Sequence, residues 1–265
     1  ASVPVDRHIF AKRFRVWADA HGFISPLNAE NLLSFHADPS PRWVFAANAG
    51  DGQVASILVT ANLLADQNTV VLRFERAAVV PEGARLLPDQ ADVRLTVRVD
   101  LEDRSFHCET KRSGVVEHHF ATHVRPLQGA PGFEFKPTAD RHVRVSASAG
   151  TYHSQPEWCE NIPHPVEQSR GQVGSGDAYS PGWFDVPLAV NAPVTLVVTA
   201  EPEGPSVEET LHFESRKSEL QQEAIQRAGL PENDRFGRAL VKAAQAFVVR
   251  RGEGKTVIAG YPWFL

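Results

Sequence analysis

Alternation of apolar and polar side chains is the feature that most constrains the fold of this chain. The segment Asp92–Asp100 reads Asp-Val-Arg-Leu-Thr-Val-Arg-Val-Asp, and residues 70–74, 142–148 and 194–199 carry similar patterns. Successive side chains of a strand point to opposite faces of its sheet, so a period of two predicts strands with one buried face. Glycine-rich turns separate the segments. The sequence through residue 199 therefore predicts a mainly β, antiparallel architecture of roughly a dozen strands, large enough for two stacked sheets.

The pattern becomes helical after Pro205. Ser206-Val207-Glu208-Glu209 is a capping box, in which each side chain accepts a hydrogen bond from a free backbone N–H of the first turn. It predicts a polar helix that runs to Ala228, with Gly229 just beyond its end and Pro231 blocking continuation.

A second helix is predicted from Asn233 or Asp234 to the glycine turn at 252–254. One stripe of it is apolar, which predicts that the helix packs against another element. This stripe consists of Phe236, Leu240, Ala243, Ala244 and Phe247.

Charge and composition exclude several classes of protein. The net charge of −5 and the lack of a long basic run argue against nucleic acid as a partner. No apolar stretch approaches the roughly 18 residues of a membrane span, so we expect no membrane partner. Two cysteines, Cys108 and Cys159, are too few for a disulfide framework, and the start of the chain has no signal-peptide pattern. We therefore expect a cytoplasmic protein.

Two short motifs suggest a phosphate site and a metal site, but the residues around each motif argue against the site. Gly252 to Thr256 ends in Gly-Lys-Thr, but a phosphate loop needs an earlier glycine where Val249 stands, and a helix after the loop. A helix-to-loop turn is the preferred interpretation. Histidines and a cysteine gather on runs that we interpret as strands of a hairpin, where alternation sends neighbouring histidines to opposite faces. We therefore expect no metal site and no cofactor. These residues are His107, Cys108, His118, His119 and His123.

Hydrolysis of glycosidic bonds needs two carboxylates about 5 to 9 Å apart. The β region offers several candidates, but no spacing singles out a pair, and no Gly-x-Ser-x-Gly elbow indicates a serine nucleophile. The candidate carboxylates are Glu157, Glu160, Glu167, Asp177 and Asp185.

The segment 156–184 mixes charges, glycines and aromatic residues unusually densely. A long loop of this kind costs entropy unless it is ordered against something. We interpret it first as a contact between domains and second as a direct ligand contact. The residues that we expect to make these contacts are Trp158, Glu160, Asn161, Glu167, Arg170, Asp177 and Phe184.

The sequence ends on the aromatic cluster Gly-Tyr-Pro-Trp-Phe-Leu. Tyr261, Trp263 and Phe264 have the flat apolar rings that stack on sugars, but they also suit the core of a further domain. An apolar terminus invites association, so we expect the sequence to be cut within a motif that opens another domain.

Residues Phe247 to Phe264 carry a more specific resemblance, above all Gly-Lys-Thr-Val-Ile-Ala-Gly-Tyr-Pro-Trp-Phe. The stretch resembles the opening of the catalytic domain in glycogen debranching enzymes of the bacterial and archaeal amylo-α-1,6-glucosidase type, where a Trp-Gly-Arg-Asp motif follows. The dense segment is similar to the N-terminal domain of that family, in Glu160-Asn161, Arg170-Gly171 and Pro181-Gly182-x-Phe184 among others. Weaker similarity reaches back through Arg104 to His107, Asn68 to Val70, and Pro41 to Trp43.

The resemblance implies a super-sandwich like the N-terminal domains of glucoamylases and the fold of galactose mutarotase, packed on an (α/α)6 barrel. It implies that residues 1–203 form the super-sandwich, 204–232 a helical linker and 233–265 the truncated start of the catalytic domain. Tyr261, Trp263 and Phe264 would then lie near an α-glucan pocket, glycogen or limit dextrin being the partner. The expected function is a non-catalytic N-terminal domain of a glycogen-debranching α-1,6-glucosidase.

The chain departs from the family pattern in two ways. An expected Arg-Arg-Tyr-His-Gly-Leu-like motif is absent, and the expected catalytic carboxylates lie beyond Leu265, so we expect the chain to be inactive alone. Two alternatives remain: a free-standing carbohydrate-binding β-sandwich, and a mutarotase-like sugar epimerase, the latter supported by analogy of fold only.

Overall fold

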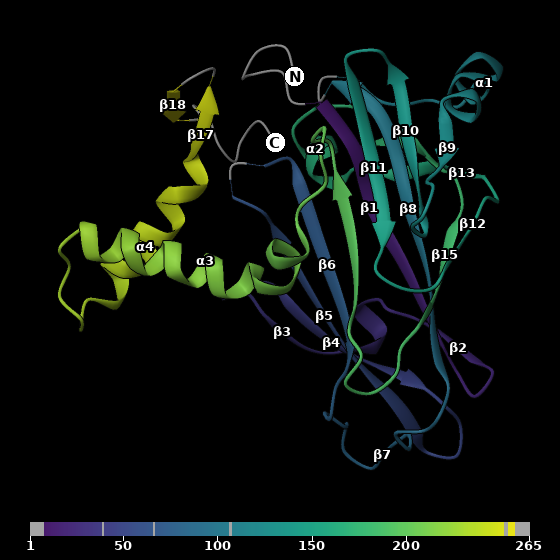
Figure 1. Cartoon of the computed structure of the whole chain (residues 1–265), viewed down its shortest axis with the longest axis horizontal. Coiled ribbons are helices and arrows are strands. Elements are labelled where there is room, and N and C mark those ends of the chain that lie inside the picture. Colours follow the sequence, from purple (N-terminus) through teal and green to yellow (C-terminus); the bar gives the residue numbers. More distant parts are fainter. Residues whose placement is uncertain (1–7, 39, 66, 106–107, 252–253, 258–265) are drawn as a thin grey trace.

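The alternating segments form two antiparallel sheets that pack face to face, as the computed structural model of the protein shows (Figure 1). It describes residues 8–38, 40–65, 67–105, 108–251 and 254–257. The prediction of a mainly β fold with two stacked sheets is therefore confirmed.

The smaller sheet has seven strands in the described residues. Its order is β2-β1-β8-β15-β12, and β14 joins β8 and carries β13 on its other side. The two long strands β1 and β8 pair over almost their whole length, with bulges near Ala11. The strands are β1 (His8–Ala20), β2 (Phe23–Pro26), β8 (Val93–Ser105), β12 (Thr151–His153), β13 (Glu157–Pro163), β14 (Ser175–Ser180) and β15 (Trp183–Pro187).

In the part of the chain that the structure describes, the larger sheet has nine strands. Eight of them follow the order β3-β4-β5-β6-β16-β11-β10-β9, and the two-residue β7 runs parallel to β5. The 3-10 turn Ala29–Asn31 leads into β3. The strands are β3 (Leu32–His36), β4 (Arg42–Asn48), β5 (Gln53–Leu63), β6 (Thr69–Arg76), β7 (Arg85–Leu86), β9 (Val124–Pro126), β10 (Gly132–Thr138), β11 (Arg141–Ala147) and β16 (Val194–Thr199).

The core lies between the sheets and follows the alternation. Leu95 and Val97 of β8 are inaccessible to solvent, as are Phe133 and Phe135 of β10 in the facing sheet. The intervening residues of β8 are polar and point away from the core. Burying these apolar side chains supplies the main driving force for stacking the two sheets.

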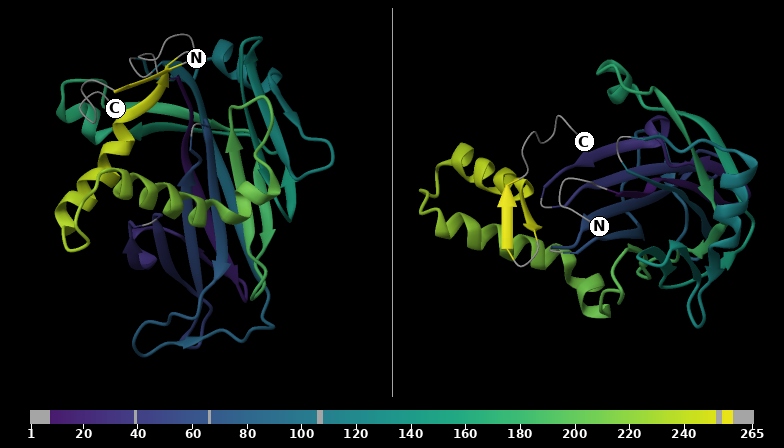
Figure 2. Two further views of the ribbon diagram at one scale, coloured as in Figure 1. Left: turned by 60° about the vertical axis from the view of Figure 1, so that its left-hand side comes forward. Right: turned by 90° about the horizontal axis from the view of Figure 1, so that it is seen from above.

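Two helices leave the sandwich beyond residue 203 and run side by side (Figures 1 and 2). The helix α3 (Val207–Arg227) begins at Ser206 with both hydrogen bonds of the predicted capping box. It is kinked at His212, and the next residue, Phe213, packs on the outer face of the larger sheet against Leu64, Val71 and Val197. The helix α4 (Arg235–Ala244) begins at Asp234, which accepts a hydrogen bond from the N–H of Gly237.

Several predicted details are wrong. The second helix does not run to the glycine turn: it ends at Ala244, a 3-10 turn follows over Gln245–Phe247, and β17 (Val248–Arg251) pairs with β18 (Gly254–Val257). Lys255 and Thr256 lie on strand β18, where a phosphate loop would require the start of a helix. Among the described residues, no helix has the length and apolar character needed to cross a membrane.

Candidate functional site

The dense segment 156–184 is ordered structure of the smaller sheet, so its interpretation as a long loop is wrong. It contains β13, the short helix α2 (Pro165–Ser169), β14 and the start of β15. Two of its predicted contact residues, Phe184 and Trp158, pack against other aromatic side chains of the sandwich. Phe184 is fully buried against Tyr152, and Trp158 packs against Phe120 and Tyr179 with ring centroids 5.4 and 5.3 Å away. The alternation of β15, which puts Phe184 and Val186 on one face, is the signal that would have placed Phe184 in the core.

Asp177 is the centre of a cluster that brings together three of the predicted residues. Its carboxylate is almost inaccessible and accepts hydrogen bonds from the backbone N–H of Arg112, at 2.7 Å, and of Asn161, at 2.8 Å. Asn161 has a left-handed backbone with φ of 55° at a bulge in β13. Burial alone would raise the pKa of Asp177, but the two backbone hydrogen bonds lower it.

Arg112 connects this cluster to the helix α1 (Gly114–Thr122). Its guanidinium donates to Glu160 at 2.7 Å and to Glu117 at 3.0 Å, so α1 is tied to β13. We name Asp177, Asn161, Arg112, Glu160 and Glu117 the rim cluster. These ion pairs are exposed and each contributes little to stability, but together with the buried Asp177 they fix the shape of this end of the sandwich.

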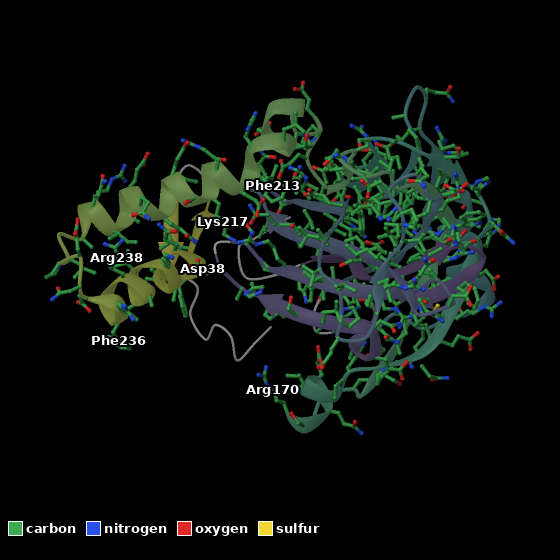
Figure 3. All side chains as sticks on the ribbon, turned by 90° about the horizontal axis from the view of Figure 1, so that it is seen from below. Asp38, Arg170, Phe213, Lys217, Phe236 and Arg238 are labelled. Atoms are coloured by element: carbon green, nitrogen blue, oxygen red, sulfur yellow. The ribbon has the colours of Figure 1, made fainter. Side chains whose placement is uncertain are left out.

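Glu167 and Arg170 lie at the short helix between β13 and β14. Glu167 is in α2, and Arg170 is the residue that ends this helix (Figure 3). The N–H of Arg170 donates to the carbonyl oxygen of Glu167 at 3.0 Å. Tyr261, Trp263 and Phe264, the predicted sugar-stacking residues, lie outside the described residues.

Buried charges on β8 are a feature that the sequence interpretation missed. Asp100 and Glu102 have no solvent exposure, although they point away from the core. Asp100 accepts hydrogen bonds from Arg13 and Arg15 of β1, and Glu102 accepts from Lys12 at 3.2 Å and from Arg104. The alternation of β8 predicts the outward direction, but only the pairing with β1, more than 80 residues away, supplies the cations.

His164 joins Asp100, Glu102 and their cationic partners, and we name this group of residues the charged row. It is the residue before α2, and its Nε2 accepts a hydrogen bond from the Nζ of Lys12. Burial lowers the pKa of His164, and the adjacent charge of Lys12 lowers it further.

The histidine interpretation is wrong because His118 and His119 lie on α1, not on a strand. Ser113 begins this helix by accepting a hydrogen bond from the N–H of Val116, a signal that the sequence carried. His123 follows α1, Cys108 is exposed, and His107 lies outside the described residues. Among the described residues, no three His, Cys, Asp or Glu side chains are placed to hold a metal ion.

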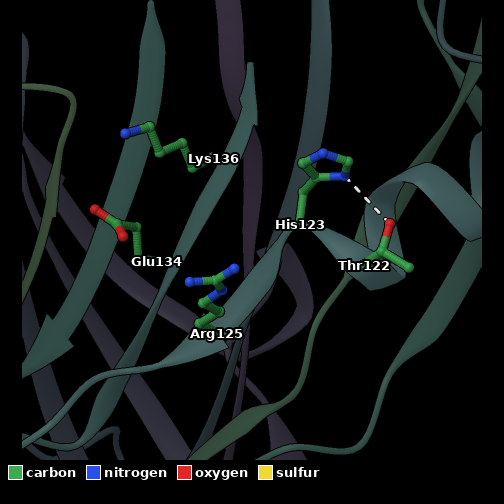
Figure 4. Close-up of a pocket in the computed structure, with 5 residues that line it drawn as sticks. All are labelled: Thr122, His123, Arg125, Glu134 and Lys136. Atoms are coloured by element: carbon green, nitrogen blue, oxygen red, sulfur yellow. Dashed lines mark hydrogen bonds between the residues drawn. The ribbon is translucent and has the colours of Figure 1, made fainter. Parts of the chain in front are cut away.

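The cavities that we find near α1 are small, and one of about 320 Å³ is lined partly by the apolar Val115, Val116 and Phe120. It also holds the carboxylates of Asp103 and Glu109, of which Asp103 pairs with Arg141. A second, of about 270 Å³, is lined by Thr122, His123, Arg125, Glu134 and Lys136, and in it His123 bonds the hydroxyl of Thr122 (Figure 4). It offers a single carboxylate, whereas glycoside hydrolysis uses two.

Most of the candidate carboxylates are already engaged. Glu157 pairs with Arg15, Glu160 with Arg112, and Asp185 with Arg94. A general acid must hold a proton that it can deliver, and a carboxylate paired with a guanidinium is poorly suited to that task. Glu157, Glu160 and Asp185 are therefore poorly suited to act as general acids.

Comparisons with known proteins give a matching family and a similar solved structure. The model of a protein family described as "Glycogen debranching enzyme N terminal" matches residues 6–195, which contain almost all of both sheets. Among solved structures, a bacterial glucoamylase complexed with acarbose is similar, with 10% sequence identity and a TM-score of 0.44. The similarity covers 94% of this chain and 33% of that chain, so the protein spans about a third of the length of the glucoamylase. No curated protein matches the chain.

Proposed function

This chain belongs to the family of glycogen debranching enzyme N-terminal domains, and we propose that it is the non-catalytic N-terminal domain of a glycogen-debranching α-1,6-glucosidase. In this proposal, residues 1–203 are a β super-sandwich, 204–232 are a helical linker, and 233–265 begin an α-helical catalytic barrel. The sandwich packs on that barrel and helps to shape its α-glucan site, where Tyr261, Trp263 and Phe264 contribute. The protein acts in the cytoplasm, a location supported by its two free cysteines.

The observation that carries the proposal is an apolar stripe on α4 that faces solvent. The side chain of Phe236 is 79% exposed and that of Leu240 is 59% exposed. The two lie one helical turn apart, and Phe236 points away from the sandwich (Figure 3). An amphipathic helix presents such a stripe when a further element covers it. The family supplies the expected cover, which is a catalytic domain in the same protein.

The sandwich itself supports a non-catalytic role. Three of its outward-facing carboxylates, Asp100, Glu102 and Asp185, are paired with arginine or lysine side chains. The proposal therefore assigns bond cleavage to the barrel and gives the sandwich a structural part in presenting the glucan.

A double substitution on α4 tests the packing. In the protein extended through the domain that follows, Phe236→Asp with Leu240→Asp places two charges where an apolar contact is proposed. We expect glucose release from limit dextrin to fall by at least about tenfold, because the catalytic site loses its support. The matched control is Leu211→Asp on α3, whose side chain is 51% exposed, and it keeps the activity.

The same double substitution in the 265-residue chain separates packing from folding. Here the stripe faces solvent, so the thermal midpoint stays within about 2 °C of the wild-type value. Full activity of the doubly substituted extended protein contradicts the proposed packing.

A further inference from the structure

A pair of tryptophans stands on the outer face of the smaller sheet. Trp17 of β1, Thr96 of β8 and Asp185 of β15 are direct cross-strand neighbours. Each alternates with residues of the core, such as Ala18, Leu95 and Phe184, so all three point outward. The short Thr96 leaves a low floor between its larger neighbours.

Trp183 borders the same floor two residues before Asp185. The ring of His153 stacks on it, with centroids 4.2 Å apart and planes 19° apart. Its indole N–H donates to the side-chain oxygen of Gln155 at 3.0 Å, and the carbonyl oxygen of Gln155 accepts from Arg98 at 3.1 Å. These contacts fix the orientation of the ring, which is half-buried.

Trp17 is held in a similar way, because the guanidinium of Arg15 lies 5.5 Å from the centre of its ring. Strand spacing of about 4.8 Å and a rise of about 3.3 Å per residue separate the backbones of Trp17 and Trp183 by about 12 Å. This span is longer than one sugar ring. We name Trp17, Thr96, Trp183, Asp185 and Arg94 the tryptophan platform.

The charges of the platform are paired, which indicates the kind of ligand. Arg94 holds Asp185 through two hydrogen bonds of 2.8 and 2.6 Å, and Arg98 lies 3.5 Å from Glu157. A polyanion needs unpaired cations, whereas a neutral, hydroxyl-rich chain needs planar donors and acceptors at the edge of an aromatic floor. The platform therefore suits a neutral, hydroxyl-rich chain.

The platform lies on the side of the sandwich opposite the helices. Phe213 of α3 packs on Val71 and Val197, which are on the outer face of the larger sheet. The anchored part of α3 therefore lies on the face of the sandwich opposite to the platform.

We propose that the tryptophan platform binds a linear segment of α-glucan, and so holds the polymer at a second point away from the catalytic site. The choice of α-glucan rests on the proposed function, while the existence of a neutral saccharide site rests on the geometry. Rings that are already fixed lose little conformational entropy on binding, which favours their use as stacking surfaces.

Calorimetric titration of the 265-residue chain with maltoheptaose tests the platform. We expect measurable binding by the wild-type chain, and binding at least about tenfold weaker after Trp17→Ala with Trp183→Ala. Thr96→Arg keeps both tryptophans but covers the floor between them, and it weakens binding to a similar extent. The matched control is Trp43→Ala, which removes a half-buried tryptophan from β4 of the other sheet and leaves the affinity unchanged.

Three results overturn the inference: no binding by the wild-type chain, an equal loss in the Trp43→Ala control, or unchanged affinity in the Thr96→Arg variant when its thermal midpoint is that of the wild type. Its failure is distinct from failure of the proposed function. An extended protein that releases glucose from limit dextrin while the 265-residue chain binds no maltoheptaose keeps the proposed function and removes the platform.

Discussion

Buried polar contacts at single residues hold the smaller sheet in shape. Asp177 joins the backbone of Arg112 to that of Asn161, and Glu102 lies fully buried with Lys12 and Arg104 around it. Removing one partner from such a group leaves a buried charge uncompensated, which costs more than the pair contributes. These residues therefore restrict which changes the outer face tolerates.

The stability of the fold depends on pH through His164. Burial and the charge of Lys12 lower its pKa, while Glu167 and Glu102 raise it and Arg104 lowers it. In the unfolded chain its pKa is about 6.5, so the unfolded state takes up a proton there that the folded state does not. Its neutral form therefore contributes stability above about pH 6.5, and this contribution is lost as the pH falls through that value.

His164→Gln tests this dependence, because glutamine accepts from Lys12 and does not titrate. We expect the free energy of unfolding in urea to fall more from about pH 7.5 to about pH 5.5 in the wild type than in the variant. His118→Gln, at an exposed position on α1, keeps the wild-type dependence. Identical pH profiles of wild type and His164→Gln contradict the assignment.

Phe213 packs helix α3, the longest helix described, against the sandwich. The side chain is 2% exposed, and the kink at His212 precedes it directly. Phe213→Ala leaves a cavity against Val71 and Val197, and we expect docking of α3 to weaken by roughly 3 kcal/mol. Hydrogen exchange checks this: amides of α3 exchange faster in the variant, while those of β8 do not change.

Leu211→Ala provides the matched control for that experiment. Leu211 is two residues away on the same helix but 51% exposed, so its truncation leaves exchange in α3 unchanged. Equal effects of the two substitutions would show that α3 is not held by Phe213.

The elements that the sequence predicted correctly are those with local signals. Strand β8 alternates without interruption, and α3 begins at the capping box of Ser206. The short helix α1 was missed, although Ser113 is a sound first residue for a helix, because the histidines that follow suggested a hairpin. The pairing of Asp100 with Arg13 and Arg15 of β1 depends on contacts distant in sequence, which periodicity does not contain.

At the scale of the whole molecule, the two outer faces of the sandwich differ. The larger sheet carries α3, and α4 runs beside α3 with its apolar stripe exposed, as Phe236 in Figure 3 shows. A salt bridge of 2.8 Å between Lys242 and Asp38 links α4 back to the sandwich. The smaller sheet carries the charged row and the tryptophan platform. The candidate site was predictable only in part. The sequence singled out Glu160, Asn161 and Asp177 of the rim cluster, but the platform needs the register of β1, β8 and β15.

The proposal that this chain is the non-catalytic part of a glycogen-debranching glucosidase is tested by glucose release from limit dextrin. Release is measured with the 265-residue chain and with the protein extended through the following domain. The account predicts no release by the 265-residue chain and release by the extended protein, because the sandwich presents the glucan and the barrel cleaves it. Catalytic turnover by the purified 265-residue chain would contradict the account.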